Sequence, residues 1–272
     1  MLTRTGAPTK EPLSISSNGA PAKAGDVELR DISHSFGQLS VISSLSLHAA
    51  PPRVLGIVGP SGCGKSTLLE LVAGLREPDA GTITVDGETH PADRLSRCAY
   101  MPQRDLLLPW MTAIDNAALA LLNRGVRRVE ARRRAAPLFE RFGLSGFEAA
   151  RPAELSGGMR QRVAFLRTLV AGKPVLLLDE PFASLDAITR AEMQEWLAAA
   201  LGAEPRTVVL VTHDVEEALF LCDRVAVLSP RPGSLVTELD GAERTQDRTG
   251  VVTSPEFAAL HERALRALRG ER

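Results

Sequence analysis

Residues 53–74 read RVLGIVGPSGCGKSTLLELVAG. The apolar run Arg53–Val58 stops at Gly59 and predicts a buried strand, and the periodicity of Lys65–Gly74 predicts a helix. Between them, residues 59–66 fit the pattern G-x-x-x-x-G-K-[ST]. A strand, a glycine-rich turn and a helix N-terminus in this order expose backbone N–H groups at the positive end of a helix dipole. This stretch therefore predicts a phosphate-binding loop in an α/β fold.

The chemistry of a nucleotide explains the residue types in this loop. Lys65 would reach the β- and γ-phosphates, and the Ser66 hydroxyl would ligate Mg²⁺. Lys65 is also one of only four lysines in the chain, which makes its place in the pattern informative. The residues expected to surround the phosphates are Gly59, Pro60, Ser61, Gly62, Cys63, Gly64, Lys65, Ser66 and Thr67.

Cys63 lies inside the loop, beside a helix N-terminus and Lys65. Both features lower the pKa of a thiol, so we expect Cys63 to react readily with maleimides and to be protected by nucleotide. The alternative is that the thiol packs beneath the loop, as Ala or Ser would. Cys98 and Cys222 fall in apolar segments, where we expect them to be shielded. Three cysteines without C-x-x-C spacing predict neither a disulfide framework nor a zinc site.

A second buried strand, Val175–Leu178, ends in the acidic pair Asp179 and Glu180. Two adjacent carboxylates at the end of an apolar strand are costly without a cation. Beside a phosphate loop, Asp179 would hold Mg²⁺, and Glu180 would orient or deprotonate the attacking water. The pair therefore predicts nucleotide hydrolysis.

Thr212-His213-Asp214 follows another predicted strand, Thr207–Val211. Asp214 is expected to cap the next helix, with Glu217 completing a capping box. His213 is then left at the C-terminal end of a parallel strand, where open α/β sheets bind their ligands. A contact between His213 and the γ-phosphate is the functional interpretation, which is favoured only with the family resemblance given below; the alternative is that the segment only caps the helix.

Composition limits the class of protein. The chain has 272 residues, of which 44% are hydrophobic and 24% charged, as in a globular protein with one large domain or a domain with an added lobe. A net charge of −1 gives no general attraction to nucleic acid or acidic membranes. The N-terminus lacks the apolar stretch of a secretory signal, and no apolar run approaches the roughly 20 residues that cross a bilayer. We expect a cytoplasmic protein.

Strand and helix signals alternate along much of the chain, which predicts a mostly parallel sheet covered by helices. Val27–Phe36 and Val41–His48 alternate in polarity and predict an antiparallel β subdomain. Residues 112–142 contain no strand-like run and predict helices at about 112–123 and 127–142, which would form an inserted helical subdomain. The expected parts are a disordered tail at 1–25, a nucleotide-binding domain at 26–240 with a helical subdomain at about 104–171, and a C-terminal extension at 241–272 whose closing helix covers 255–268.

A second stretch also has the features of an anion site. Residues 154–162 read ELSGGMRQR, in which Ser156 is a good N-cap and Gly157 and Gly158 expose N–H groups at the start of a helix. Taken alone, the stretch is better explained by an ordinary capped helix.

Six segments occur in a fixed order: the phosphate loop, Gln103 after a strand, LSGG, LLLDEP, the SLD that ends at Asp186, and THD. The series resembles the ATP-binding cassette family over about residues 26–240. The resemblance implies a P-loop NTPase core of the RecA-like type, ATP and Mg²⁺ as cofactors, and a homodimer of head-to-tail cassettes. The LSGG segment is the signature loop of the family. Each signature loop would close on the ATP of the other copy, which would explain why one chain carries two anion sites.

The resemblance also implies roles for individual residues. Ser156 and Gly158 would contact the γ-phosphate across the dimer, with Gly157 between them in the same nucleotide-binding loop, and Asp186 would lie at the dimer seam. The same comparison makes Gln103 a sensor of Mg²⁺ and the attacking water.

Two positions of the resemblance need comment. Phe36, in the segment HSFGQ, sits where the family places an aromatic ring against adenine; the alternative is a core phenylalanine. Met159 stands where the signature usually has Gln, which removes a side-chain contact but leaves the N–H donors of the loop.

The segment LLLPWMTAIDNAALAL, with LSGGMRQR and PFASLDAITR, is similar to the ATPases of nitrate, sulfonate and taurine importers. This implies a subunit on the inner face of the cell membrane, bound to integral membrane permease chains and served indirectly by an extracellular solute-binding protein. Gln103–Trp110 would border the groove that receives a cytoplasmic helix of the permease; alternatively, Trp110 packs within the helical lobe. The solute is not encoded here, because its cavity lies in other subunits.

The alternative function is a soluble cassette ATPase that acts on DNA or ribosomes. Most DNA-repair cassettes carry a long coiled coil between the phosphate loop and the signature, but this stretch has no heptad run. Ribosomal types usually carry two cassettes per chain. Neither class explains the LLLPW segment, and we expect no nucleic-acid partner.

Overall fold

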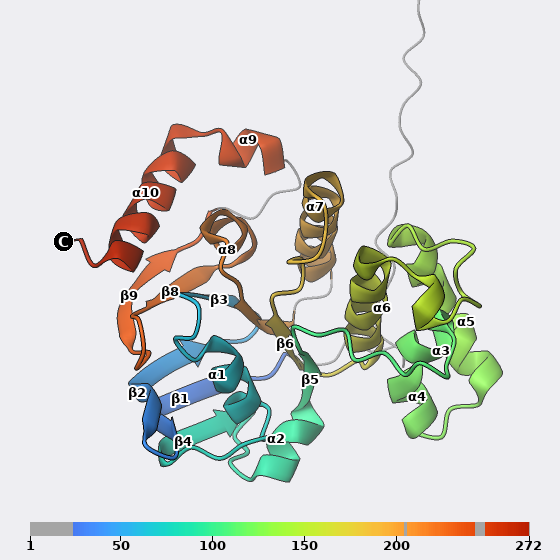
Figure 1. Ribbon diagram of the computed structural model, residues 1–272, viewed down its shortest axis with the longest axis horizontal. Coiled ribbons are helices and arrows are strands. Elements are labelled where there is room, and N and C mark those ends of the chain that lie inside the picture. Colours follow the sequence, from blue (N-terminus) through green and yellow to red (C-terminus); the bar gives the residue numbers. More distant parts are fainter. Residues whose placement is uncertain (1–23, 204–205, 243–247, 272) are drawn as a thin grey trace, which may run out of the picture.

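The computed structural model describes the chain except for residues 1–23, 204–205, 243–247 and 272. Figure 1 shows a central sheet with helices on its faces, a smaller sheet beside it, and a helical lobe to one side. The predicted tail at 1–25 falls almost wholly outside the described residues. Within them, no helix is both long and apolar enough to cross a membrane.

The central sheet has six strands in the order β5-β6-β7-β3-β8-β9. All neighbouring strands are parallel except β8 and β9, which are antiparallel. The prediction of a mostly parallel sheet is therefore confirmed. The strands are β3 (Val54–Val58), β5 (Cys98–Met101), β6 (Val175–Asp179), β7 (Thr207–Val211), β8 (Arg224–Leu228) and β9 (Leu235–Asp240).

The middle strands β3, β6 and β7 are buried along their whole length because helices or strands cover both faces. Leu177 packs into a core shared with the smaller sheet, whereas its neighbours Leu176 and Leu178 pack into the core on the opposite face. Successive side chains of a strand point to opposite faces, so each apolar strand supplies both cores. Helix α1 (Lys65–Val72) packs into the core that is shared with the smaller sheet. The core on the opposite face contains residues of α7 (Ala187–Ala203), α8 (Val215–Leu221) and α10 (Pro255–Arg269).

The smaller sheet is antiparallel, with β1 between β2 and β4. Val27 and Leu29 of β1 are buried while Arg30 is exposed, which is the alternation expected of a sheet with one covered face. The predicted antiparallel strands are confirmed. Their bounds are β1 (Val27–Phe36), β2 (Leu39–Ala49) and β4 (Ala80–Val85).

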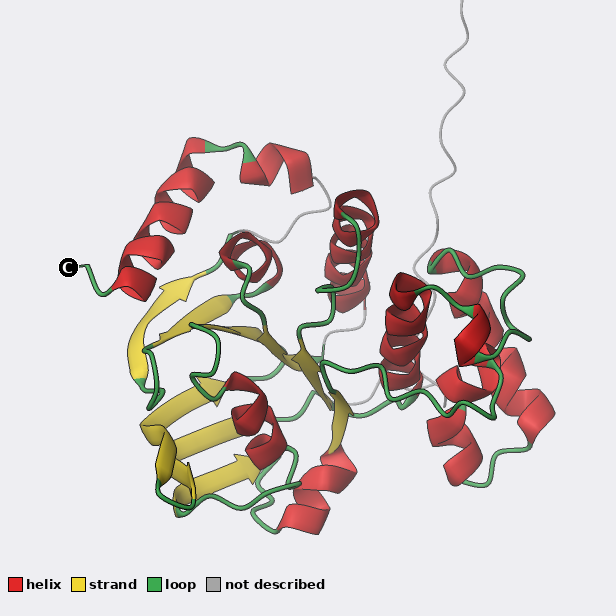
Figure 2. Cartoon of the chain, viewed as in Figure 1, coloured by secondary structure: helices red, strands yellow, loops and turns green. Residues whose placement is uncertain are grey.

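The helical lobe follows β5 and returns to the central sheet at β6. Its described residues form helices and loops only, as Figure 2 shows. The helix predicted from 112 to 123 is two short helices that meet at Ala118, whereas the one predicted from 127 to 142 is continuous. The elements are α3 (Ala113–Ala117), α4 (Leu119–Asn123), α5 (Arg128–Arg141), the 3₁₀ turn η1 (Pro152–Glu154) and α6 (Gly157–Val170).

Two short helices were not predicted, α2 (Pro91–Arg97) and α9 (Arg248–Val252). In α2 only Arg94 is buried, so the helix has no apolar periodicity to reveal it. The closing helix α10 was predicted. Ser254 accepts a hydrogen bond from the Phe257 N–H at its start, and Gly270 ends it with a φ of 70°.

Candidate active site

The phosphate loop connects β3 to α1. Gly62 and Gly64 have φ angles of 77° and 106°, a backbone conformation that residues with a Cβ rarely adopt. A Cβ on Gly64 would also lie 2.9 Å from the Cγ1 atom of Val41. The loop leads directly into the N-terminus of α1, where the first backbone N–H groups have no partner within the helix. The glycines of the motif are therefore required by the geometry of this turn.

Lys65 is buried at the base of the loop and its ammonium group lies against the loop backbone. Lys65 Nζ donates hydrogen bonds to the carbonyl oxygens of Gly59, at 2.7 Å, and Pro60, at 3.1 Å. These bonds hold the cation at the cavity described next, where a phosphate group can replace a carbonyl as its partner.

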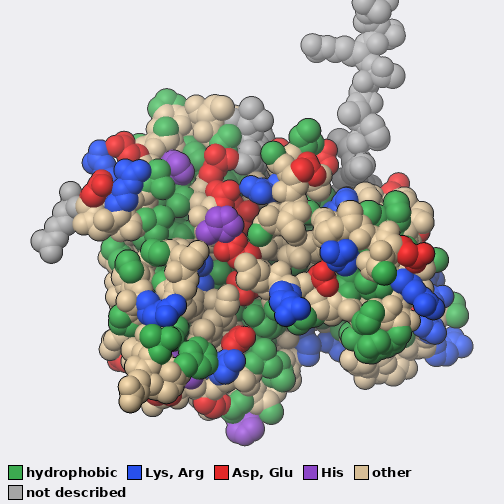
Figure 3. All heavy atoms as spheres, viewed as in Figure 1, with side chains coloured by type: hydrophobic (Ala, Val, Ile, Leu, Met, Phe, Trp, Pro, Cys, Tyr) green, Lys and Arg blue, Asp and Glu red, His purple; other side chains and the backbone are tan. Residues whose placement is uncertain are grey.

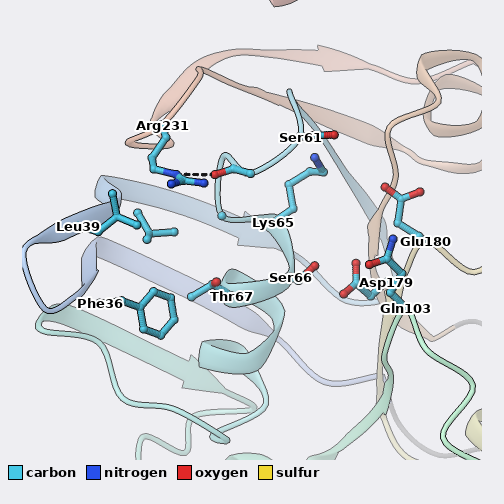
Figure 4. A pocket seen from close by; sticks show the side chains of 13 residues that line it. Phe36, Leu39, Ser61, Lys65, Ser66, Thr67, Gln103, Asp179, Glu180 and Arg231 are labelled. Carbon is cyan, nitrogen blue, oxygen red and sulfur yellow. Dashed lines mark hydrogen bonds between the residues drawn. The ribbon is translucent and has the colours of Figure 1, made fainter.

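The loop forms one wall of a cavity of about 400 Å³, shown in Figure 4. Its size is in the range of small-molecule sites. Phe36 and Leu39 lie at one end of the cavity, and Asp179, Glu180 and Gln103 lie at the other. The lining residues are the predicted Phe36, Ser61, Gly62, Gly64, Lys65, Ser66, Thr67, Gln103, Asp179 and Glu180, together with Leu39, Val41 and Arg231, which were not predicted. Of the predicted loop, Gly59, Pro60 and Cys63 do not line it.

The expectation of a reactive Cys63 is wrong. The side chain is 1% exposed and lies beneath the loop, where a Cβ on Gly59 would come within 2.8 Å of Cys63 Sγ. Burial raises the pKa of the Cys63 thiol, although the nearby Lys65 ammonium acts in the opposite direction. The effect of desolvation on the thiol pKa outweighs the effect of the nearby positive charge, so the thiol stays protonated. The side chain therefore has the packing role that Ala or Ser would have.

Phe36 is not a core residue. Its side chain is 43% exposed at the end of β1, at the apolar end of the cavity. The His34 ring meets it edge-on at 5.0 Å between centroids, and the Arg76 guanidinium lies 5.0 Å from its centroid. A ring held by two neighbours and open to the cavity is suited to stack on a planar base.

The acidic end of the cavity has the features of a cation site. Asp179 is 2% exposed, and its Oδ1 atom has no hydrogen-bond partner. Burial raises the pKa of Asp179, while a hydrogen bond from the Ser66 side chain opposes the shift. An unpartnered buried carboxylate oxygen is costly without a cation, and carboxylate and hydroxyl oxygens suit Mg²⁺. Asp179 and Ser66, with the Gln103 side chain lining the same cavity, therefore fit a magnesium ion.

Glu180 and His213, which follow the neighbouring strands β6 and β7, meet at this end of the sheet. Glu180 has a φ of 51°, which is uncommon for a residue with a Cβ and typical of functional positions. Its N–H donates to the Val211 carbonyl at 2.8 Å. Glu180 Oε2 is hydrogen-bonded to His213 Nδ1. Two predicted catalytic residues are thus brought into contact, although His213 itself does not line the cavity.

Figure 3 shows the setting of this end on the whole molecule. Acidic side chains and a histidine gather near the middle of the face shown, over the part of the molecule that contains the central sheet. Because a parallel sheet presents the carboxyl ends of its strands at one edge, such side chains collect there.

The capping box predicted after His213 is only half formed. Asp214 accepts a hydrogen bond from the Glu217 N–H at 3.1 Å, which confirms the cap. The Glu217 side chain does not return the bond; it is 3% exposed and accepts one from Gln194 Nε2 on α7 at 3.0 Å. Burial, with smaller effects of Asp214 and Glu180, raises the pKa of Glu217 to about 7.

This buried carboxyl predicts a dependence of stability on pH. Since the pKa of Glu217 is 4.5 in a solvated chain and about 7 in the fold, the folded protein binds the extra proton and loses stability as pH rises through this window. Glu217→Gln removes the ionisable group. The variant should be more stable than the wild type by about 3 kcal/mol at pH 8 but only by about 1 kcal/mol at pH 5.

Urea unfolding at the two pH values measures this difference. Glu140→Gln, an exposed position on α5, is the control and should match the wild type at both. A gain for Glu217→Gln that is equal at pH 5 and pH 8 would contradict the assignment.

The signature segment begins α6, as predicted. Ser156 Oγ accepts a hydrogen bond from the Met159 N–H at 3.2 Å, and Gly157 is the first helical residue. Met159 packs its side chain against the core. Ser156, Gly157 and Gly158 do not line the cavity of their own chain.

Asp186 is also outside the cavity. Its carboxylate accepts hydrogen bonds from the Thr189 N–H, at 3.0 Å, and from the Thr189 hydroxyl, at 2.7 Å. These bonds lower the pKa of Asp186. In one chain, therefore, the phosphate loop and the signature segment remain two separate sites.

Arg231 is the main lining residue that sequence reasoning missed. It lies in the segment SPRPG between β8 and β9, which reads as an ordinary proline- and glycine-rich turn. The only local signal is a positive charge at the tip of a turn, and this does not indicate which segment the charge faces.

Comparison with known proteins agrees with this site. A protein-family model described as ABC transporter matches residues 42–183. The taurine import ATP-binding protein TauB of Rhizobium johnstonii is 46% identical over 75% of this chain and 80% of that protein. The formylaminopyrimidine import ATP-binding protein ThiZ of Halalkalibacterium halodurans is 44% identical over 77% and 82%. The aliphatic sulfonates import ATP-binding protein SsuB 1 of Rhodococcus jostii is 46% identical over 75% and 79%.

A solved structure has the same fold. It is the dimeric, post-hydrolysis state of the ATP-binding cassette MJ0796 bound to ADP and phosphate, with a TM-score of 0.71 and 27% identity over 79% of this chain and 98% of that one. The loop, the acidic strand end and the family match all lead to one conclusion. The chain belongs to the ABC transporter family, as an ATP-binding cassette that hydrolyses ATP.

Proposed function

We propose that the chain is the ATP-hydrolysing, nucleotide-binding subunit of an importer and that two copies act head to tail. The strongest support is that the phosphate loop and the signature segment of one chain lie apart. The phosphate loop lines the cavity, whereas Ser156 and Gly158 lie outside it. A second copy placed head to tail brings its signature helix to the γ-phosphate, where a helix N-terminus stabilises an anion. Asp186 would then lie at the seam between the copies.

Within each chain, ATP would extend along the cavity from Phe36 to the acidic end. Phe36 would stack on adenine, and Lys65 would bind the β- and γ-phosphates. When bound, Mg²⁺ would be held by Ser66 and Asp179, with Gln103 nearby, and would supply positive charge to the phosphates.

Glu180 would accept the proton of the attacking water. The bond from its N–H to the Val211 carbonyl and the bond from its carboxylate to His213 hold it in position. His213, placed beside the carboxylate, would also contact the γ-phosphate.

The relatives support import as the transport direction, since their names describe import ATP-binding proteins. The subunit would work on the inner face of the membrane, bound to integral permease chains, with an extracellular solute-binding protein that delivers the solute. We place the solute in the nitrate, sulfonate and taurine class of small molecules. A soluble cassette acting on DNA or ribosomes explains neither these relatives nor the surface described next.

The segment that follows Gln103 is held tightly to the helical lobe. Arg167 of α6 donates hydrogen bonds to the carbonyls of Asp105, at 2.7 Å, and Leu106, at 2.8 Å. The Asn116 side chain accepts from the Leu108 N–H at 2.7 Å and donates to the Leu108 carbonyl at 3.2 Å. The backbone of this segment is therefore fixed by the lobe.

Two of its large apolar side chains nevertheless face outward, whereas Leu107 is buried in the core. Leu106 is 55% exposed and Trp110 is 71% exposed, so the alternative in which Trp110 packs within the lobe is wrong. An exposed tryptophan on a well-anchored segment is typical of a protein interface. We assign this surface to the permease.

If Trp110 docks on the permease, a change at this position should uncouple ATP hydrolysis from transport. Trp110→Glu should reduce transport by the assembled complex at least tenfold, because a charge would be buried at the interface, and should leave ATP hydrolysis by the isolated chain within about twofold. Val129→Glu, an equally drastic change at an 82% exposed position of α5, is the matched control. An unchanged transport rate for Trp110→Glu would rule out the docking surface.

The function as a whole is tested by purification of the tagged full chain from detergent-solubilised membranes. We expect an integral membrane permease to co-purify. Ribosomes or DNA in its place would contradict the importer assignment and favour the soluble alternative.

A further inference from the structure

Arg231 enters the nucleotide cavity from a part of the chain that no motif marks. It lies in the loop between β8 and β9 and lines the cavity with Leu39, Val41 and Gly62. Figure 4 shows the guanidinium group on the side of the cavity near Leu39, away from Asp179 and Glu180.

The loop that carries Arg231 is fixed against β2 and the phosphate loop. The Gly233 N–H donates to the Val41 carbonyl at 2.8 Å, and the Ser43 N–H donates to the Gly233 carbonyl at 3.0 Å. A Cβ on Gly233 would lie 2.2 Å from the Cys63 carbonyl oxygen, so only glycine permits this approach. The backbone beside Arg231 is therefore held in place.

The guanidinium group has unused donors. Arg231 Nε donates to the Gly62 carbonyl at 2.9 Å. Among the described residues, no ion pair joins Arg231 to a carboxylate; its Nε–H bonds a carbonyl, and a guanidinium has five N–H donors in a planar fork. A cation without a counter-charge at a phosphate-binding cavity is suited to bind an anionic ligand.

We propose that Arg231 is a nucleotide-binding residue that contacts the phosphate oxygens nearer the sugar, in both ADP and ATP. Its Nε bond holds the Gly62 carbonyl away from the anion, and its terminal N–H groups bind the phosphates. Because it lies away from Glu180, it acts on nucleotide affinity and not on the hydrolytic step. The proposal depends on the nucleotide site alone and not on the importer assignment.

The test uses the isolated full chain with Mg²⁺ and titration calorimetry. Arg231→Ala and Arg231→Gln should weaken binding of ADP and ATP about tenfold, as expected for loss of one charge-assisted contact, and should leave adenosine binding unchanged. Arg231→Lys keeps the charge and should lose only about threefold. Arg224→Ala, at the start of the preceding strand β8, is the matched control and should bind like the wild type.

Three results would overturn the proposal. One is wild-type affinity for ADP in a folded Arg231→Ala variant. Another is wild-type affinity in Arg231→Gln, because the amide can still bond the Gly62 carbonyl and a purely structural role would suffice. The third is an equal loss in the Ala, Gln and Lys variants together with a lowered melting temperature. If Arg231→Ala fails to fold, the comparison of the Gln and Lys variants still decides between these outcomes.

Discussion

Glu180→Gln is expected to reduce ATP hydrolysis by about 10²-fold or more while ATP binding is retained. The amide keeps the shape of the side chain but cannot accept a proton from the attacking water. The Lys65 contacts and the Phe36 platform are untouched, so the nucleotide should stay bound and hold two copies together.

Two measurements check this result. Steady-state hydrolysis gives the loss of rate, and size-exclusion chromatography with ATP and Mg²⁺ should show the variant at twice the monomer mass of 29.2 kDa. Glu140→Gln, exposed on α5, controls for the loss of one carboxylate. Normal hydrolysis by a monomeric Glu180→Gln would sink the catalytic assignment. The rate carries more weight than the mass, because dimers can be weak without the permease.

Ser156→Arg should abolish hydrolysis and leave ATP binding to the isolated chain near normal. Ser156 lies outside the cavity of its own chain, so a bulky cation there would block only the partner's site. Lys65→Ala should instead weaken ATP binding itself, at least tenfold, because Lys65 lines the cavity and supplies its charge.

Titration of both variants with ATP separates these effects. Ser156→Ala is the control for the lost helix cap, worth about 1 kcal/mol of stability, without the added bulk. Mixing Ser156→Arg with Lys65→Ala should restore some hydrolysis, since the mixed dimer contains one complete site. Equal loss of ATP affinity in the two variants would count against the head-to-tail arrangement.

The features that were predictable depend on contacts between near neighbours in the chain. Ser156 and Asp214 each cap a helix by accepting a bond from an N–H three positions later. The turn of the phosphate loop depends on Gly62 and Gly64, whose conformations follow from the absence of a Cβ. The apolar runs of β6 and β7 and the acids that end β6 follow in the same way from short stretches.

The errors arose where a distant segment changed the surroundings of a side chain. The local charge of Lys65 predicted a reactive Cys63, but burial of the thiol dominates. The spacing of Asp214 and Glu217 predicted a capping box, but Gln194 on α7 binds the Glu217 carboxyl. The exposure of Trp110 excludes only the alternative of packing within the lobe, and it too depends on distant contacts, because Arg167 holds the backbone of the segment and leaves the ring outside.

By itself, the sequence determined which local motifs the chain carries: a phosphate loop, an acidic strand end and a helix capped by Ser156, each encoded within a few consecutive residues. Only the tertiary structure decided how these groups meet. Arg231 and Gly62 are 169 positions apart, and Glu180 and His213 are 33 apart, yet both pairs are hydrogen-bonded. The physical reason is that desolvation and hydrogen bonding depend on which surfaces the fold brings together, and no local pattern of residues specifies that contact.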